Sequence, residues 1–207
     1  LTHDDLGTRK RYLNAKHTMR TLLEAGAIPI VNENDTVAVE EIQLGDNDNL
    51  SAQVSVLIEA DLLVILSDIE GLFDKDPRFH QDAVRVPLVD RFHESLLASG
   101  GAAGPLGRGG MASKLQAAYQ AALSGIPTIL ADGRKEDTLA RVFEAHTYIG
   151  TLFLPVADRL GSRKHWIAYT LKSAGALVVD AGASAAIKEQ GRSLLSPGIQ
   201  HVRGMFD

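Results

Sequence analysis

Short apolar runs flanked by turn-forming residues recur along this chain. They stand at residues 27–31 (AIPIV), 61–67 (DLLVILS), 126–133 (IPTILADG) and 150–155 (GTLFLP). A continuous apolar run of this length is typical of a strand that is buried on both faces, as in a parallel sheet. We therefore predict strands at these positions, and residues 61–67 carry the clearest signal.

The first helix is predicted near the start of the chain. Asp4 or Asp5 can cap its beginning, and Gly26 supplies its C-terminal stop. The apolar positions of this helix recur at helical spacing: Leu13, Met19, Leu22 and Leu23.

Three further helices are predicted at residues 49–60, 111–125 and 137–145, and the first of them is capped by Asp48 or Asn49. Strands that alternate with helices indicate crossover units around a parallel sheet. The predicted fold class is therefore α/β, with a mostly parallel sheet sandwiched by helices.

The pattern changes near residue 157. Residues 158–174 contain a basic cluster and the Trp, and residues 175–207 give short strands, a short helix and glycine turns. We expect one α/β domain at 1–157, a linker at 158–174 and the beginning of a small β-rich domain at 175–207. Both ends of the chain interrupt a pattern, so we expect a fragment of a longer protein.

Composition excludes several classes of protein. Of 207 residues, 45% are hydrophobic and 23% charged, which is ordinary for a globular protein. The formal charge of −5 gives nucleic acid no overall attraction. The chain has no cysteine, which fits a reducing cytoplasm. No apolar run approaches the roughly 20 residues that a membrane-spanning helix needs.

Acidic and amide side chains cluster at residues 32–35 and 46–49, on either side of a short mixed segment. Each of these residues taken alone favours a structural role, as a helix cap or in an Asx-turn. Several of them beside the end of one predicted strand suit an amino-acid ligand, because a carboxylate accepts hydrogen bonds from ammonium and an amide can bridge to a carboxylate. The spacing does not match a calcium-binding EF-hand loop.

A glycine-rich stretch, GPLGRGGMASK, leads into the helix predicted at 111–125. Free N–H groups at a helix start favour a phosphate, and Lys114 lies about one turn inside the helix. The Walker pattern is absent, so this is not a P-loop. A flexible loop with a helix cap is the structural alternative.

The third candidate is the turn SDIEGLFDKDP, which follows the strand at 61–67. It is either a plain turn or a wall of a nucleotide site at the C-terminal end of a strand. The metalloprotease motif H-E-x-x-H and the hydrolase motif G-x-S-x-G are both absent from the sequence.

These stretches, in this order, resemble the glutamate 5-kinase family of the amino acid kinase superfamily. The resemblance rests on VNENDTVAVEEIQLGDNDNLSA, LLVILSDIEGLFDKDPR and GRGGMASKLQAA. It continues through SRKHWIAY and VVDAGASAAIKEQGRSLLSPGI, which resemble the linker and the beginning of a PUA domain. It implies ATP-dependent phosphorylation of the γ-carboxylate of L-glutamate to γ-glutamyl phosphate, the first step of proline biosynthesis, with Mg²⁺.

The resemblance also implies roles for individual residues. Asp35 and Asn47 would bind glutamate, Lys114 would neutralise charge on the transferring phosphoryl group, and Asp48 would hold active-site lysines in position. The implied contacts to ATP are Ser67, Asp68, Arg108, Gly109, Gly110, Met111, Ala112, Ser113 and Lys114. Family members often carry Thr at the positions of Arg108 and Ser113, so the phosphate contact of Arg108 departs from the pattern.

Two elements of the family have no counterpart here: an N-terminal strand with a K-x-G lysine and a Ser-Gly-Ala loop. We therefore expect the isolated chain to be inactive and poorly stable. Proline as a feedback inhibitor, a homo-oligomer (dimer or tetramer) and a cytoplasmic location are family expectations. The competing hypotheses are another amino acid kinase, such as acetylglutamate kinase, and an RNA-binding PUA protein; the acidic balance of the chain disfavours RNA.

Overall fold

The computed structural model of the chain describes residues 1, 3–32, 46–92, 96, 110–144, 149–156 and 175–204. It divides into two compact units, Leu1–Thr170 and Leu171–Asp207. The predicted linker at 158–174 lies outside the described residues, and the domain boundaries stay a prediction.

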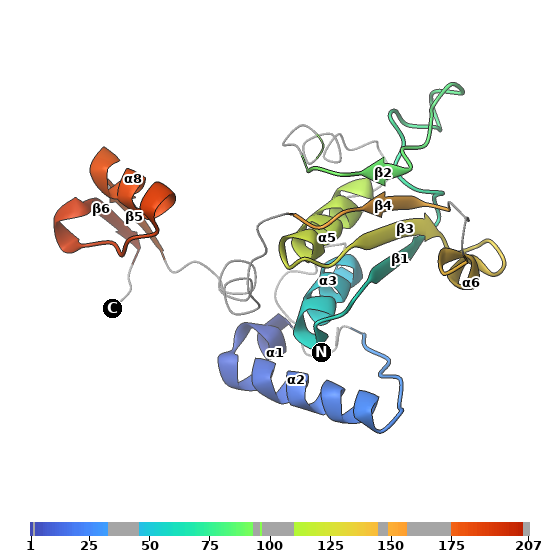
Figure 1. Ribbon diagram of the computed structural model, residues 1–207, viewed down its shortest axis with the longest axis horizontal. Coiled ribbons are helices and arrows are strands. Elements are labelled where there is room, and N and C mark those ends of the chain that lie inside the picture. The colour runs from blue at the N-terminus through green and yellow to red at the C-terminus, as the bar shows by residue number, and fades with distance from the viewer. Residues whose placement is uncertain are drawn as a thin grey trace. The chain divides into compact units, whose positions relative to one another are not determined.

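The first unit contains a four-stranded sheet in the order β1-β3-β4-β2 (Figure 1). Its strands are β1 (Leu63–Ser67), β2 (Leu88–Val89), β3 (Thr128–Asp132) and β4 (Thr151–Phe153). Two of the three pairings, β1 with β3 and β2 with β4, are parallel, and β3 with β4 is antiparallel. The strands predicted at 61–67, 126–133 and 150–155 are confirmed, and so is the mostly parallel sheet.

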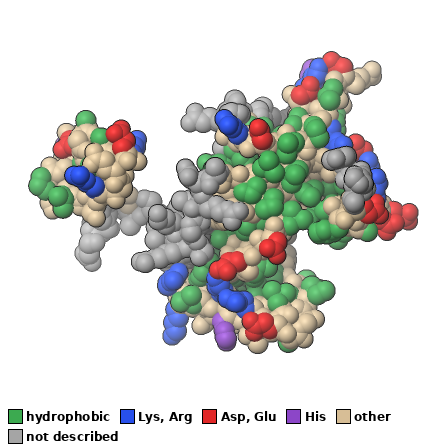
Figure 2. Space-filling model, in the orientation of Figure 1, with side chains coloured by type: hydrophobic (Ala, Val, Ile, Leu, Met, Phe, Trp, Pro, Cys, Tyr) green, Lys and Arg blue, Asp and Glu red, His purple; other side chains and the backbone are tan. Residues whose placement is uncertain are grey.

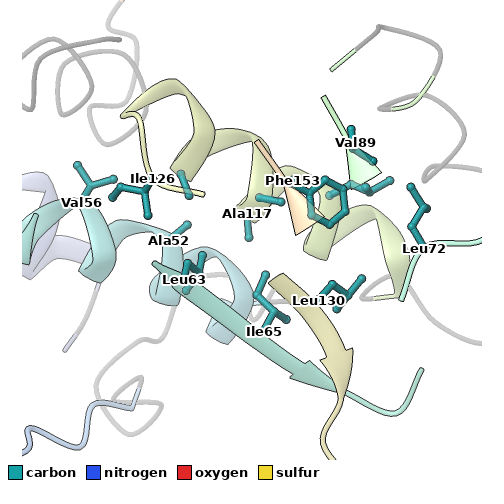
Figure 3. Packing of buried hydrophobic residues seen from close by; sticks show 13 residues of the cluster. Ala52, Val56, Leu63, Ile65, Leu72, Val89, Ala117, Ile126, Leu130 and Phe153 are labelled. Carbon is teal, nitrogen blue, oxygen red and sulfur yellow. The ribbon is translucent and has the colours of Figure 1, made fainter. Parts of the chain in front are cut away.

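Helices α3 (Asp46–Ile58) and α5 (Met111–Leu123) pack against each other, and α3 also packs against β1, whereas α5 packs against both β1 and β3. Small side chains let α5 approach closely, because Ala117, Ala118 and Ala121 are fully buried. Beneath them, Leu130 and Phe153 complete the core shown in Figure 3. On the opposite face of β1, Leu66 is exposed.

The predicted cap of α3 is wrong. The helix begins at Asp46, so Asp48 and Asn49 lie in its first turn instead of before it. The Asp48 side chain accepts hydrogen bonds from Ser113 and Lys114 of α5, as described below.

The N-terminal helix is confirmed in part. It is split into α1 (His3–Gly7) and α2 (Arg9–Glu24), with Thr8 at the N-cap of α2 in place of the predicted Asp4 or Asp5. Tyr12 and Met19 are buried on α2. The predicted apolar positions that prove exposed are Leu13, Leu22 and Leu23. A second, small core forms where Leu6, Tyr12 and Met19 meet Leu57 of α3.

The strand predicted at residues 27–31 is wrong. No strand is formed there, and Ile28 and Ile30 are 88% and 97% exposed. A strand needs a paired neighbour for its backbone N–H and C=O groups. None of the described strands pairs with this segment, so its apolar composition alone does not make it a strand.

The second unit contains a two-stranded antiparallel sheet of β5 (Gly175–Val179) and β6 (Ile199–Gly204). Helix α8 (Ala181–Gln190) and a short 3₁₀ turn, η1 (Ser196–Gly198), connect the two strands. Asp180 caps α8 by accepting a hydrogen bond from the N–H of Ala183 at 2.7 Å. No helix in the described part of the chain combines the length and the apolar character that crossing a membrane requires.

Candidate functional site

The candidate site lies at the edge of the sheet where β1 and β3 end. Helix α3 leads into β1 through residues 59–62, and α5 leads into β3 through residues 124–127. Each helix therefore runs back along its strand, so that the helix starts and the strand ends meet at one edge (Figure 1). This is the edge at which open α/β sheets bind their ligands.

An ion pair joins the starts of the two helices. The Lys114 Nζ lies 3.1 Å from Oδ2 of Asp48, and the side chains are only 16% and 18% exposed. The hydroxyl of Ser113 donates to the same carboxylate oxygen at 2.6 Å. Asp48 thus holds Lys114 and Ser113 together. The resemblance implies that Ser113 contacts ATP, and in the structure its hydroxyl contacts Asp48.

The first turn of α5 offers backbone donors to an anion. Gly110 is its N-cap and has no side chain that can cap the helix, while Met111, Ala112 and Ser113 follow in the first turn. The N–H groups of a first turn have no partner within the helix and carry a partial positive charge. Together with the Lys114 ammonium, this turn is suited to phosphate oxygens.

Asn47, the residue before Asp48 in α3, lines a cleft of about 350 Å³. The polar lining of the cleft includes Asn32 and Ser51, and the remainder is largely apolar. The side-chain oxygen of Asn49, also in α3, is buried and has no hydrogen-bond partner among the residues that the structure describes. A buried acceptor without a partner costs free energy, and a donor from a ligand would satisfy it.

Ser67 is the last residue of β1 and Asp68 begins the turn that follows, and the Ser67 hydroxyl donates to Asp68 Oδ1 at 3.1 Å. The fully buried Thr151 anchors this turn from β4, because its hydroxyl accepts from the N–H of Leu72 at 2.8 Å and donates to the carbonyl of Val86 at 2.6 Å. Gly71 has a φ of +143°, and a Cβ on it would lie 2.6 Å from that hydroxyl oxygen. The turn is therefore fixed closely to the sheet.

Asp132 and Arg134 also belong to this edge, and the sequence reasoning missed them. The signal was present, because ADGR follows a buried parallel strand as SDIE does. Hydrogen bonds from the side chain and then the backbone N–H of Arg134 lower the pKa of Asp132 from 3.8 to about 2. The carboxylate is therefore ionised at neutral pH.

Three of the predicted site residues, Asp35, Arg108 and Gly109, lie outside the described residues. Within the described ranges, no group of three or more His, Cys, Asp or Glu side chains is arranged to hold a metal ion. The structure brings Asp48 together with Ser113 and Lys114 at the start of α5, and it places Ser67 and Asp68 at the same edge of the sheet.

The chain is similar to several known proteins. The chain is 52% identical over its whole length to the glutamate 5-kinase of Trichlorobacter lovleyi and 49% identical to that of Syntrophotalea carbinolica. It spans 55% and 56% of these two relatives, about half their length. Among solved structures, a UMP kinase from Bacillus anthracis is similar at 16% identity and a TM-score of 0.44, over 70% of this chain and 52% of that one.

A family model gives the most direct assignment. Residues 1–132, which include α3, β1, the start of α5 and β3, match the model described as the amino acid kinase family. This match covers more than half of the chain. The chain belongs to the amino acid kinase family.

Proposed function

We propose that this chain is part of a glutamate 5-kinase, which transfers the γ-phosphoryl group of ATP to the γ-carboxylate of L-glutamate. The observation that carries the proposal is the Asp48–Lys114 ion pair, which holds an ammonium in the first turns of α5, beside the N-terminal end of that helix. The identity of about 50% to proteins named glutamate 5-kinase supports the choice of substrate.

The chemistry needs no general base. A glutamate γ-carboxylate is ionised at neutral pH, so one of its oxygens attacks the γ-phosphorus directly. An O–P bond forms, the bond to the bridging oxygen of ADP breaks, and ADP leaves with the electron pair. Catalysis then depends on holding the two substrates in line and on neutralising the phosphoryl oxygens. A site of one lysine and helix N–H groups fits this requirement.

The proposed roles are those that the resemblance implies. Lys114 neutralises charge on the transferring phosphoryl group, and Asp48 holds Lys114 in place. Asn47, which lines the cleft, binds glutamate, and the resemblance assigns Asp35 to the same ligand, while the turn of Ser67 and Asp68 receives the nucleotide. Mg²⁺ enters with ATP, since it keeps several waters and substrate phosphates as ligands and needs few protein ligands.

Further family features belong to the same proposal. The second unit, with its antiparallel strands β5 and β6 and the connecting helix α8, is proposed as the beginning of a PUA domain. Proline biosynthesis as the pathway, feedback inhibition by proline, assembly into a dimer or tetramer and a cytoplasmic location are proposed from the family.

The test uses a fused enzyme, in which this chain is joined at Leu1 to the part of the Trichlorobacter lovleyi relative that precedes its matching segment. We expect ADP release that depends on L-glutamate, and hydroxylamine should trap the acyl phosphate as a hydroxamate. The 207-residue chain alone should release no ADP. Turnover of N-acetylglutamate in place of glutamate, or tight salt-sensitive binding of RNA without kinase activity, would contradict the proposal.

Lys114→Met in the fused enzyme should lower kcat by at least about 100-fold, because it removes a charge that acts on the transferring group. Lys10→Met is the matched control, because Lys10 is exposed on α2. The Lys10→Met enzyme should therefore retain full activity. Equal kcat values for the two variants would remove Lys114 from the mechanism.

A further inference from the structure

The ends of β1 and β3 are neighbours in the sheet. Ser67 pairs with Asp132 in the register of the two parallel strands, and the N–H of Gly133 donates to the Ser67 carbonyl at 2.8 Å. The two turns that follow therefore start side by side. A Cβ on Gly133 would lie 2.9 Å from the Cβ of Leu66, so the second turn approaches β1 as closely as a residue without a side chain allows.

Arg134 connects these two turns. Its Nε and Nη2 each lie 3.0 Å from a carboxylate oxygen of Asp132, which forms a two-pronged ion pair. Its backbone N–H donates to the same carboxylate at 3.0 Å. The Nη2 also donates to the backbone carbonyl of Asp68. One guanidinium thus holds the end of β3 and the turn of Ser67 and Asp68 in a fixed relation.

A second link lies beside the first. Lys135 donates to the carboxylate of Glu70, two residues beyond Asp68. Figure 2 shows basic and acidic side chains gathered at this end of the first unit, where α6 (Thr138–Val142) lies in Figure 1. The turn after β1 is therefore held by Thr151 from one direction and by Arg134 and Lys135 from another.

We propose that Arg134 is a positioning residue for the nucleotide: by holding the Asp68 carbonyl against Asp132, it fixes the Ser67–Asp68 turn in the shape that receives ATP. This inference rests on the proposed function, which puts ATP at that turn. Arg134 is 67% exposed, whereas its partner Asp132 is only 7% exposed. Loss of Arg134 should therefore weaken nucleotide binding through the turn and also cost some stability, because a largely buried carboxylate loses its partner.

The test compares Arg134→Gln, Arg134→Lys and Arg78→Gln in the fused enzyme. Arg78 is the matched control, because it makes the same two-pronged contact with Asp76 two residues earlier and also lies in the electrostatic field of Asp68. The contacts found among the described residues do not include one from Arg78 to a carbonyl of the Ser67–Asp68 turn. It therefore controls for the loss of positive charge alone.

We expect Arg134→Gln to raise the KM for ATP about tenfold, with kcat and the KM for glutamate within about twofold of the unmodified enzyme. Arg134→Lys should give an intermediate KM, since a lysine can still donate to the Asp68 carbonyl. The midpoint of thermal unfolding of Arg134→Gln should fall by about 4 °C, because the Asp132 carboxylate loses its partner, so every KM is measured well below that midpoint. An unchanged KM for ATP, an equal rise for both substrates, or the same rise in Arg78→Gln would overturn the proposal.

Calorimetric titration with ADP separates this inference from the proposed function. If the fused enzyme binds ADP but does not phosphorylate glutamate, the proposed substrate is wrong, and weaker ADP binding by Arg134→Gln still supports the positioning role. If Arg134→Gln fails to fold, Arg134→Lys decides, because ADP affinity equal to that of the unmodified enzyme would then overturn the proposal.

Discussion

Asp48 and Lys114 are 66 residues apart in the sequence, yet the Lys114 ammonium lies 3.1 Å from the Asp48 carboxylate. Each lies in the first turns of a helix, and the two helices pack side by side. The pair is largely removed from water, where charges interact more strongly than at the surface. Packing of α3 on α5 therefore fixes the position of the proposed catalytic cation.

The first prediction concerns the strength of this pair. Asp48→Asn should lower the free energy of unfolding by about 2 kcal/mol, because it leaves a largely buried ammonium without its counter-charge. Urea unfolding of Asp48→Asn, Lys114→Met and the double variant forms a thermodynamic cycle. The coupling energy should be about 1–2 kcal/mol. Strictly additive effects of the two substitutions would show that the pair contributes nothing to the fold.

The second prediction concerns Thr151. Thr151→Val keeps the shape of the side chain but removes the hydroxyl that the N–H of Leu72 and the carbonyl of Val86 share. Both groups would be left without this partner, so the free energy of unfolding should fall by about 2 kcal/mol. Thr151→Ser retains the hydroxyl and is the matched control. Equal urea midpoints for the Val and Ser variants would contradict the importance of these hydrogen bonds.

The sequence was sufficient to predict β1, β3, β4 and α5, because local apolar runs and alanine-rich segments determine them. It was not sufficient at residues 27–31, where the apolar composition predicted a strand. In the described part of the chain this segment has no neighbouring strand to pair with. It also missed β2, which has two residues and is defined by its pairing with β4. Non-local pairing decides such elements, and a single sequence does not display it.

The site shows the same limit. The motifs identified Asp48 and Lys114, but the ion pair between them depends on how α3 and α5 pack. Asp132 and Arg134 carry no motif that the sequence reasoning used, and they became visible through the register of β3 with β1. The sequence alone was enough to predict which residue types stand at the strand ends. It was not enough to predict the partner of each side chain.

The third prediction contrasts two apolar positions. Leu130 lies in the centre of β3 and is buried, so Leu130→Ala should lower the free energy of unfolding by about 3 kcal/mol or abolish the unfolding transition. Ile30→Ala removes a side chain that is almost fully exposed, so in the 207-residue chain it should cost less than about 0.5 kcal/mol. Urea unfolding of both variants measures the difference. A large cost at Ile30 would show that residues 27–31 are packed in solution.

The fourth prediction concerns the second unit. Asp180→Ala removes the carboxylate that accepts from the Ala183 N–H and should destabilise α8 by about 1 kcal/mol. Asp180→Asn can still accept this hydrogen bond and is the matched control. Hydrogen exchange of the amides in α8 reports the local effect, and faster exchange in the Ala variant alone is expected. Equal exchange in both variants would contradict the cap.

The fifth prediction is the pH dependence that Asp132 contributes. The pKa of Asp132 is about 2 in the folded chain, because Arg134 donates hydrogen bonds to its carboxylate, against 3.8 for an unperturbed Asp. The unfolded chain therefore binds a proton at Asp132 more readily than the folded chain does. Stability consequently rises with pH between about pH 2 and about pH 4. The contribution should be complete above about pH 5 and should disappear as the pH falls from about 4 towards about 2.

The carboxylates of Glu59 and Asp76 also have lowered pKa values, owing first to hydrogen bonds from Lys16 and Arg78, so they contribute to acid sensitivity in the same direction. The difference between the unmodified chain and Asp132→Asn isolates Asp132 from them. Urea unfolding at several pH values should give a difference in free energy that is largest near neutral pH and shrinks steadily below about pH 4. A difference that stays constant down to about pH 2 would show that Arg134 does not stabilise the ionised carboxylate in the folded protein.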